Sequence, residues 1–325
     1  MKGKIFHFLD DAAWDAPFFK RLAHNDTGSA SGHQSGVFIP RDIRCYFPEL
    51  DEDLISGANP TTDRYLTAEM FILDQQVATA IVRYQLQTWT GTRTPERRIT
   101  ANLGPVLNHA SGGDLLVMQR SRDKLEVYRL ILVRKSDVAY AQIDKLRQNK
   151  SCGALYPSDH PMSQTDLITA KAAMLAEAAQ PFVAIRSEIP RTVSARTAIA
   201  RDTAFRETLL AQYQRCCAVS GISLTANSVA EVQAAHVVGL ARGGADEPRN
   251  GLVLTGTLHW AFDKGLFSVS DTRRVIIPDR VMSMPENAWL SQFRDSPILE
   301  ASKYDLRTAP EAFAWHRDNL LAQWN

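Results

Sequence analysis

Two histidines, an asparagine and an aspartate lie close together in the second half of the sequence. His236 ends an apolar segment, Asn250 follows a glycine-containing loop, and His259 and Asp263 lie four residues apart. Histidine is the side chain best matched to deprotonating water near neutral pH. Cutting a phosphodiester needs such a base, a cation for the charge that builds on phosphate, and a group that orients the base. This cluster therefore has the side chains for phosphodiester hydrolysis.

The elements around these residues follow the order strand, loop, strand and helix. Residues 232–238 and 251–254 are apolar and strand-like, and residues 257–264 predict a short helix. A helix places residues four apart on one face, where one divalent ion can bind both His259 and Asp263. The other positions of an octahedral ion are then left to water and phosphate oxygens. We expect the Asn250 amide to fix the connecting loop and, through it, the imidazole of His236.

The order His, Asn, His at these spacings resembles the HNH endonuclease family, whose nuclease unit is a ββα-metal finger. The resemblance covers about residues 203–274 and includes Ala234-Ala235-His236, Asn250-Gly251-Leu252, and His259-Trp260-Ala261-Phe262-Asp263. It implies a metal-dependent DNA endonuclease that leaves 5′-phosphate and 3′-hydroxyl ends. It also implies roles for single residues: His236 as general base, Asn250 as positioning residue, His259 as catalytic residue and metal ligand, and Asp263 as metal ligand.

One position departs from the family pattern. Many members have an acidic residue or a histidine directly before the base as an extra ligand, and this chain has Ala235. Gln233 and Asn250 are the other candidate ligands. Carboxylate and imidazole ligands suit a hard or borderline cation, so we expect magnesium, with manganese as the other option. We expect no structural zinc, because the cysteines at positions 45, 152, 216 and 217 form no CxxC pair.

Two segments of the first half carry positive charge in loops rich in glycine or threonine. The first runs from Lys20 and Arg21 through His33, Gln34 and Phe38, and the second spans residues 91–100. An arginine fork matches guanine O6 and N7, and a glutamate accepts a hydrogen bond from cytosine N4. Lysine and arginine also suit phosphates, which position a duplex without specifying its sequence. The second segment supplies four charged side chains for this purpose: Arg93, Glu96, Arg97 and Arg98.

These two segments, with further support at residues 65–68, resemble the N-terminal effector domain of the restriction enzyme EcoRII. The resemblance spans about residues 14–138 and implies a DNA-binding pseudobarrel with two arms that enter the major groove. The first arm would contain His33, Gln34 and Phe38, and the second residues 93–98. Thr92 and Thr94 stand where the relative has basic residues, so its recognised base sequence does not carry over.

Composition sets the broad class of the protein. The 325 residues include 37 basic and 36 acidic side chains, for a formal charge of +1, which excludes a polybasic tail but allows a local basic patch. No segment approaches the roughly 20 apolar residues of a bilayer helix. We expect a cytoplasmic protein with no membrane contact.

The expected fold class is α+β, with a β-rich pseudobarrel followed by a mostly helical domain that carries the ββα-metal finger. We place the DNA-binding domain at residues 1–150, a helical linker at 151–190 and the nuclease domain at 191–325. The expected strands of the first half include residues 65–73, 77–84 and 125–133, and helices are expected over 136–148, 165–179, 192–214 and 309–324.

The hypothesis is a type II-like restriction endonuclease that binds a specific double-stranded DNA sequence. One finger cuts one strand, so we expect a homodimer. Two other hypotheses stay open: a modification-dependent DNA endonuclease, and a DNA-binding regulator with an inactive finger.

Overall fold

A computed structural model describes residues 9, 11, 13–27, 36–52, 55, 60–88, 94–122, 124–156, 160–185, 195–226 and 229–325. The chain divides into two compact units. Unit 1 comprises residues 1–165 with 227–229, and unit 2 comprises residues 166–226 with 230–325. The expected domain boundaries at 150 and 190 stay predictions.

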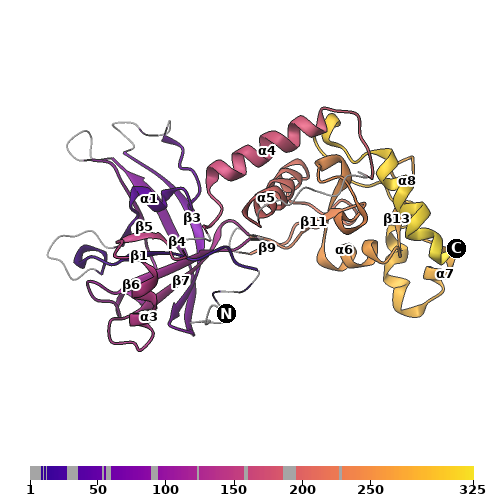
Figure 1. The fold of residues 1–325 in the computed structure, drawn as a ribbon. Coiled ribbons are helices and arrows are strands. Elements are labelled where there is room, and N and C mark those ends of the chain that lie inside the picture. The colour runs from indigo at the N-terminus through magenta and orange to yellow at the C-terminus, as the bar shows by residue number, and fades with distance from the viewer. Residues whose placement is uncertain are drawn as a thin grey trace. The chain divides into compact units, whose positions relative to one another are not determined.

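Unit 1 is built on one curled eight-stranded sheet (Figure 1). Its strands, in the order in which they lie side by side, are β2 (Val37–Phe38), β5 (Glu96–Thr100), β4 (Gln75–Gln87), β3 (Thr61–Ile72), β7 (Val127–Val133), β6 (Leu115–Arg120), β1 (Phe18–Arg21) and β8 (Cys152–Ala154). Neighbours are antiparallel except β3 and β7. The short helices are α1 (Arg41–Arg44), α2 (Gly104–Leu107) and α3 (Tyr140–Leu146).

Both faces of this sheet are covered by apolar side chains. Strand residues alternate between faces, so Phe18 and Phe19 enter different clusters. On one face, the ring of Phe47 stacks on Tyr84 and Tyr128, with centroid distances of 5.0 and 5.1 Å. On the other face, Phe19 packs in a cluster with Ile143 of α3. Buried apolar side chains therefore hold the strands from which the loops at the edge of the sheet begin.

The hairpin of β3 and β4 confirms the strands expected over residues 65–73 and 77–84. Its turn is shorter than the gap between those expected strands. β3 and β4 extend to Ile72 and Gln75, and Leu73 has a positive φ of 54° at the turn. The segment around residue 96 differs from the expectation of a loop. Residues Glu96–Thr100 form β5, because Ile99 alternates inward into the core between β2 and β4.

Unit 2 is mostly helical, with short two-stranded sheets. Its elements are α4 (Gln164–Ala178), α5 (Ala195–Gln212), β9 (Thr225–Ala226), β10 (Val229–Ala230), β11 (Gln233–His236), β12 (Gly251–Leu254), α6 (Gly256–Asp263), β13 (Ser268–Val269), β14 (Val275–Ile276), α7 (Asp279–Met282) and α8 (Pro310–Asn319). Together with the sheet of unit 1, they confirm the expected α+β class.

The last helix is shorter than the sequence predicts. α8 ends at Asn319, and a separate 3₁₀ turn follows over Leu321–Trp324. The carbonyl oxygen of Leu320 lies against Gly265, where a Cβ atom would approach it to 2.4 Å. α8 covers α6 through His316, whose ring stacks on Phe262 with a centroid distance of 3.8 Å.

Candidate functional site

The predicted strand, loop, strand and helix are present in unit 2 as β11, β12 and α6. β11 and β12 pair antiparallel, and their register sets His236 opposite Gly251. A Cβ atom on Gly251 would lie 2.4 Å from Leu209 Cδ1 and 2.8 Å from Phe205 Cζ. A Cβ atom there would displace the Leu209 and Phe205 side chains of α5, so glycine at the start of β12 keeps α5 packed closely beside it.

This packing fixes the plane of the His236 imidazole. The Phe205 ring of α5 stacks on it with a centroid distance of 3.8 Å and an interplanar angle of 4°. The edge of the imidazole meets Asp246 in the loop after β11, with 3.2 Å between His236 Nε2 and Asp246 Oδ1. A carboxylate accepts hydrogen bonds, so this contact assigns the proton to Nε2 and leaves the lone pair on Nδ1.

Asp246 is held on its other side by Arg201 of α5. Arg201 Nε donates to Asp246 Oδ2 at 3.1 Å, and its two terminal nitrogens donate to the carboxylate of Glu177 in α4 at 3.1 Å each. Burial alone would raise the pKa of the Asp246 carboxyl, but the hydrogen bonds from His236 and Arg201 outweigh burial and lower the pKa below its ordinary value. Asp246 is therefore a carboxylate at neutral pH.

Asn250 lies between the loop and β12 and is completely buried. Its Oδ1 accepts a hydrogen bond from the backbone N–H of Val238 at 2.9 Å. Its Nδ2 donates to the carbonyl oxygens of Val238, at 2.9 Å, and Ala245, at 2.7 Å. One amide thus closes the loop from 238 to 245. The loop passes so tightly that a Cβ atom on Gly244 would lie 1.9 Å from the Val238 oxygen.

His259 and Asp263 share one face of α6, as their spacing predicts. His259 Nε2 and Asp263 Oδ2 are 3.7 Å apart. His259 Nδ1 lies 2.8 Å from Gln233 Oε1. An amide oxygen only accepts, so Nδ1 carries the proton and Nε2 keeps the lone pair that a metal needs. Glu231 accepts from the backbone N–H of Gly256 at 2.8 Å and so stabilises the start of the helix.

These donors fit a divalent ion with few protein ligands. Two ligand bonds of about 2.1 Å can join donor atoms up to about 4 Å apart, which accommodates His259 Nε2 and Asp263 Oδ2. Within the described part of the chain, no group of three or more histidine, cysteine, aspartate or glutamate side chains could hold a metal. The other candidate ligands, Gln233 and Asn250, already bond to His259 and to the backbone, respectively. Such an ion would therefore keep several sites for water or phosphate.

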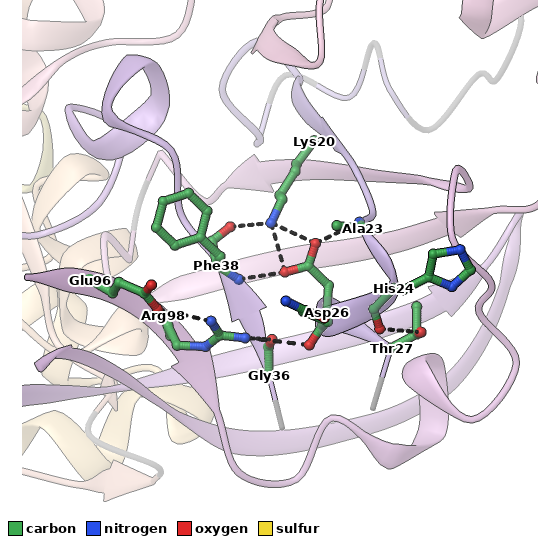
Figure 2. A network of polar contacts seen from close by, with 10 residues as sticks. Lys20, Ala23, His24, Asp26, Thr27, Gly36, Phe38, Glu96 and Arg98 are labelled. Carbon is green, nitrogen blue, oxygen red and sulfur yellow. Dashed lines mark hydrogen bonds and ion pairs between the residues drawn. The ribbon is translucent and has the colours of Figure 1, made fainter. Parts of the chain in front are cut away.

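In unit 1, Lys20 has a different environment from the one expected for a phosphate contact. Its side chain is 5% exposed and its ammonium lies 2.7 Å from an Asp26 oxygen (Figure 2). Asp26 also accepts from the backbone N–H groups of Ala23, at 2.7 Å, and Phe38, at 2.8 Å. Burial lowers the pKa of the Lys20 ammonium, against the opposing effect of Asp26. The charge of Lys20 is thus matched inside unit 1, whereas its neighbour Arg21 is exposed.

The two arginines of β5 point to opposite faces of the sheet, because strand residues alternate. Arg98 is 5% exposed, pairs with Glu96 at 3.1 Å and donates to the carbonyl oxygen of Gly36 at 2.7 Å (Figure 2). Arg97 pairs instead with Glu52, at 2.9 Å. One flat DNA surface cannot contact both side chains in this conformation.

The other predicted DNA-binding residues divide into two groups. Phe38 is half-buried, and the Lys20 ammonium lies 5.1 Å from the centre of its ring. Three predicted residues lie outside the described part of the chain: His33, Gln34 and Arg93.

Comparisons with known proteins confirm both resemblances. Residues 217–270 match the family model of HNH endonucleases, and residues 11–137 match the model of the N-terminal region of restriction endonuclease EcoRII. The second half of the chain thus contains a segment similar to HNH endonucleases, and the first half contains a segment similar to the N-terminal region of EcoRII.

Comparisons with whole proteins add little to these matches. The search of curated proteins found no match. One similar solved structure is a modification dependent TagI restriction endonuclease, with 21% sequence identity and a TM-score of 0.29. The match covers 36% of this chain and 37% of that one, and such a TM-score does not establish a common fold.

Two further observations concern membrane-spanning helices and the cysteines. Among the described residues, no helix is long and apolar enough to cross a membrane. All four cysteines are free thiols, and Cys217 beside the finger is buried.

The sequence motifs indicated the segment that the HNH family model matches, but they assigned no role to two residues that contact His236. Asp246 and Phe205 both lie within the stretches that carry the HNH resemblance. Their contacts with His236 depend on how α5 and the loop pack, and sequence spacing alone does not reveal that packing.

Proposed function

We propose that this chain is a type II-like restriction endonuclease that binds a specific double-stranded DNA sequence through unit 1 and hydrolyses it in unit 2. The observation that carries the proposal is the fixed imidazole of His236. Its plane is set by Phe205, its loop is closed by Asn250, and Nδ1 keeps a lone pair. A ring held in this way can act as a general base on water.

In the proposed reaction, His236 Nδ1 takes a proton from water as the water oxygen bonds to phosphorus. The P–O3′ bond breaks and the 3′ oxygen gains a proton from solvent. The products are a 5′-phosphate and a 3′-hydroxyl. Asn250 takes no proton, and its part is to hold the backbone of the loop in place beside the base.

His259 and Asp263 would hold one divalent ion per site, most simply magnesium, with manganese as the other option. When bound, this ion supplies positive charge to the phosphate and the departing oxygen. Gln233 contributes by fixing the tautomer of His259, so that Nε2 faces Asp263.

Unit 1 would supply the sequence recognition. The exposed cation of β1, Arg21, would contact phosphate, and residues of the two predicted arms would contact base edges. Lys20 and Arg98, held by Asp26 and by backbone oxygens, would support the arms from within. Because one finger cuts one strand, two copies of the chain would act together.

The test is digestion of a mapped supercoiled plasmid by the purified full-length chain, followed by sequencing of the ends. We expect cuts at one recurring sequence with 5′-phosphate and 3′-hydroxyl ends. EDTA should stop the cutting, and added magnesium or manganese should restore it. Intact plasmid under every metal condition would contradict the proposal.

Methylated and unmethylated preparations of the same plasmid extend the test to target choice. Cutting of both, or of the unmethylated plasmid alone, supports a reader of unmodified sequence. Cutting of only the methylated plasmid would replace that part of the proposal with a modification-dependent nuclease. Binding without cutting on either plasmid would indicate a regulator with an inactive finger.

A further inference from the structure

Two contacts determine the state of the His236 ring, and they have different effects. The Phe205 ring lies parallel to the imidazole and fixes its plane. A parallel stack alone is compatible with a ring flip, which exchanges the edge that carries Nδ1 with the edge that carries Cδ2. The contact of Nε2 with Asp246 Oδ1, at 3.2 Å, removes this freedom because only a nitrogen with a proton can donate there.

Asp246 is itself oriented from outside the loop. Oδ1 accepts a hydrogen bond from His236 Nε2, and Oδ2 accepts one from Arg201 Nε, so both carboxylate oxygens have a hydrogen-bond partner. Arg201 cannot turn freely, since Glu177 binds its two terminal nitrogens in a bidentate pair. Asn250 fixes the backbone one residue earlier, through the carbonyl of Ala245.

We propose that Asp246 is a positioning residue for His236, whose carboxylate keeps the proton on Nε2 and so presents Nδ1 to the attacking water. This inference rests on the proposed nuclease function. During the reaction Nδ1 gains the proton that water loses, and the ring becomes an imidazolium. Its Nε2–H continues to donate to Asp246, which remains a carboxylate and takes no proton.

The geometry separates this role from that of a metal ligand. Both oxygens of Asp246 already accept hydrogen bonds. The atoms that could bind a metal, His259 Nε2 and Asp263 Oδ2, face each other on α6 instead. Asp246 acts on the base, and the α6 pair is the candidate metal site.

The first measurement is the tautomer of His236 in the full-length, metal-free chain without DNA. The ¹⁵N chemical shifts of the two ring nitrogens report which one carries the proton, and His236→Ala identifies the signals. At a pH where the ring is neutral, we expect one tautomer with the proton on Nε2. Asp246→Ala should give a mixture of both tautomers, and Asp246→Glu should restore most of the original state.

The second measurement is steady-state cutting of a duplex that contains the recognised sequence. Asp246→Ala should lower kcat by about 10- to 100-fold, with KM for DNA within about twofold, as for other residues that orient a reacting imidazole. Asp246→Glu should recover part of this loss. The matched control is Asp271→Ala, an exposed carboxylate of unit 2 that pairs with Arg317, and it should leave kcat unchanged.

Several results would overturn the inference. The wild-type tautomer and kcat retained in Asp246→Ala would remove the positioning role. A normal kcat with a higher metal concentration for half-maximal rate would make Asp246 a metal ligand instead. A wild-type chain that shows the expected tautomer but cuts no DNA would refute the proposed function while leaving the hydrogen bond intact, so the two failures are distinguishable.

Discussion

Each unit contains a loop closed by one buried side chain, and the two closures differ in charge. In unit 1, the Asp26 carboxylate joins the backbone of Ala23 to that of Phe38. In unit 2, the Asn250 amide joins Val238 to Ala245. Both side chains are at most 1% exposed. The carboxylate carries a charge into the interior and requires a buried cation, Lys20, whereas the amide requires none.

Because of this difference, the charged residues beside the two loops have different contacts. The positive charge of Lys20 stabilises the loop and is not offered to a ligand. In unit 2 the loop is closed by a neutral amide. Asp246 and Arg201 take no part in this closure: Asp246 contacts the His236 ring, and Arg201 contacts Asp246.

Asp26→Ala should have the largest effect on stability. It leaves the Lys20 ammonium buried without its partner, which costs about 3–5 kcal/mol of unfolding free energy. Urea unfolding of the full-length chain, followed for the transition of unit 1, measures the loss. The control Asp63→Ala removes the carboxylate of a more exposed pair with Arg83 and should cost less than about 1 kcal/mol. Equal losses of unfolding free energy in the two variants would show that the buried pair of Asp26 and Lys20 stabilises unit 1 no more than an exposed pair does.

Asn250→Ala should cost about 2–3 kcal/mol, because it leaves backbone groups of Val238 and Ala245 buried without partners. The loss should fall on the unfolding transition of unit 2 and should be accompanied by loss of DNA cutting. Asn250→Asp keeps the acceptor for Val238 N–H but places a buried carboxylate against the carbonyl oxygens of Val238 and Ala245 without a neighbouring cation, so a loss at least as large is expected. Cutting at the wild-type rate in Asn250→Ala would contradict the positioning role.

His316 is a second neutral side chain buried in unit 2, bonded through Nδ1 to Ser268 and through Nε2 to the Phe262 carbonyl. Burial lowers the pKa of His316 from 6.5 to about 4. Between pH 6.5 and pH 4, His316 is therefore protonated in the unfolded chain but neutral in the folded chain. The contribution of His316 to the free energy of unfolding is highest above pH 6.5 and decreases as the pH falls toward 4. By pH 5 the loss from this group is about 2 kcal/mol.

Urea unfolding at pH 7.5 and pH 5 measures this loss in the wild type and in His316→Gln. The variant should lose about 2 kcal/mol less than the wild type between the two pH values. Identical pH dependence in the two proteins would show that His316 does not stay neutral in the folded chain.

The smallest effect is expected for Arg21, the exposed neighbour of Lys20. Arg21→Ala should weaken binding to specific and random duplexes equally, by less than about 1 kcal/mol, and should reduce the slope of log K against log salt by about 1. Arg134→Ala, which removes a cation matched by Asp137, should leave the slope unchanged. A loss confined to the specific duplex would make Arg21 a base contact.

The order of elements around the finger could be predicted from sequence because it depends on local spacing. His236 ends β11, Asn250 precedes β12, and α6 spans Gly256–Asp263 where residues 257–264 were expected. Partners distant in sequence could not be predicted in this way. Arg201 and Asp246 are 45 residues apart. The buried pair of Arg120 and Asp15 is 105 residues apart.

The second arm shows a different limit. A charged run next to turn-forming residues favours a loop, yet β5 forms there because Val37 and Tyr84 on the neighbouring strands pair with the inward-facing Ile99. Once residues Glu96–Thr100 are a strand, the opposite directions of Arg97 and Arg98 follow from the two-residue period. The environments of Lys20 and Arg98 depend on this tertiary pairing, which charge patterns do not reveal.

The role of His236 as general base is tested by comparing His236→Ala with the wild-type chain in cutting, duplex binding and thermal stability on the same preparations. We expect a loss of at least about 100-fold in cutting rate, with unchanged affinity for the specific duplex and little change in Tm. Cutting that persists, or binding that disappears together with cutting, would contradict the assignment of His236 as the base.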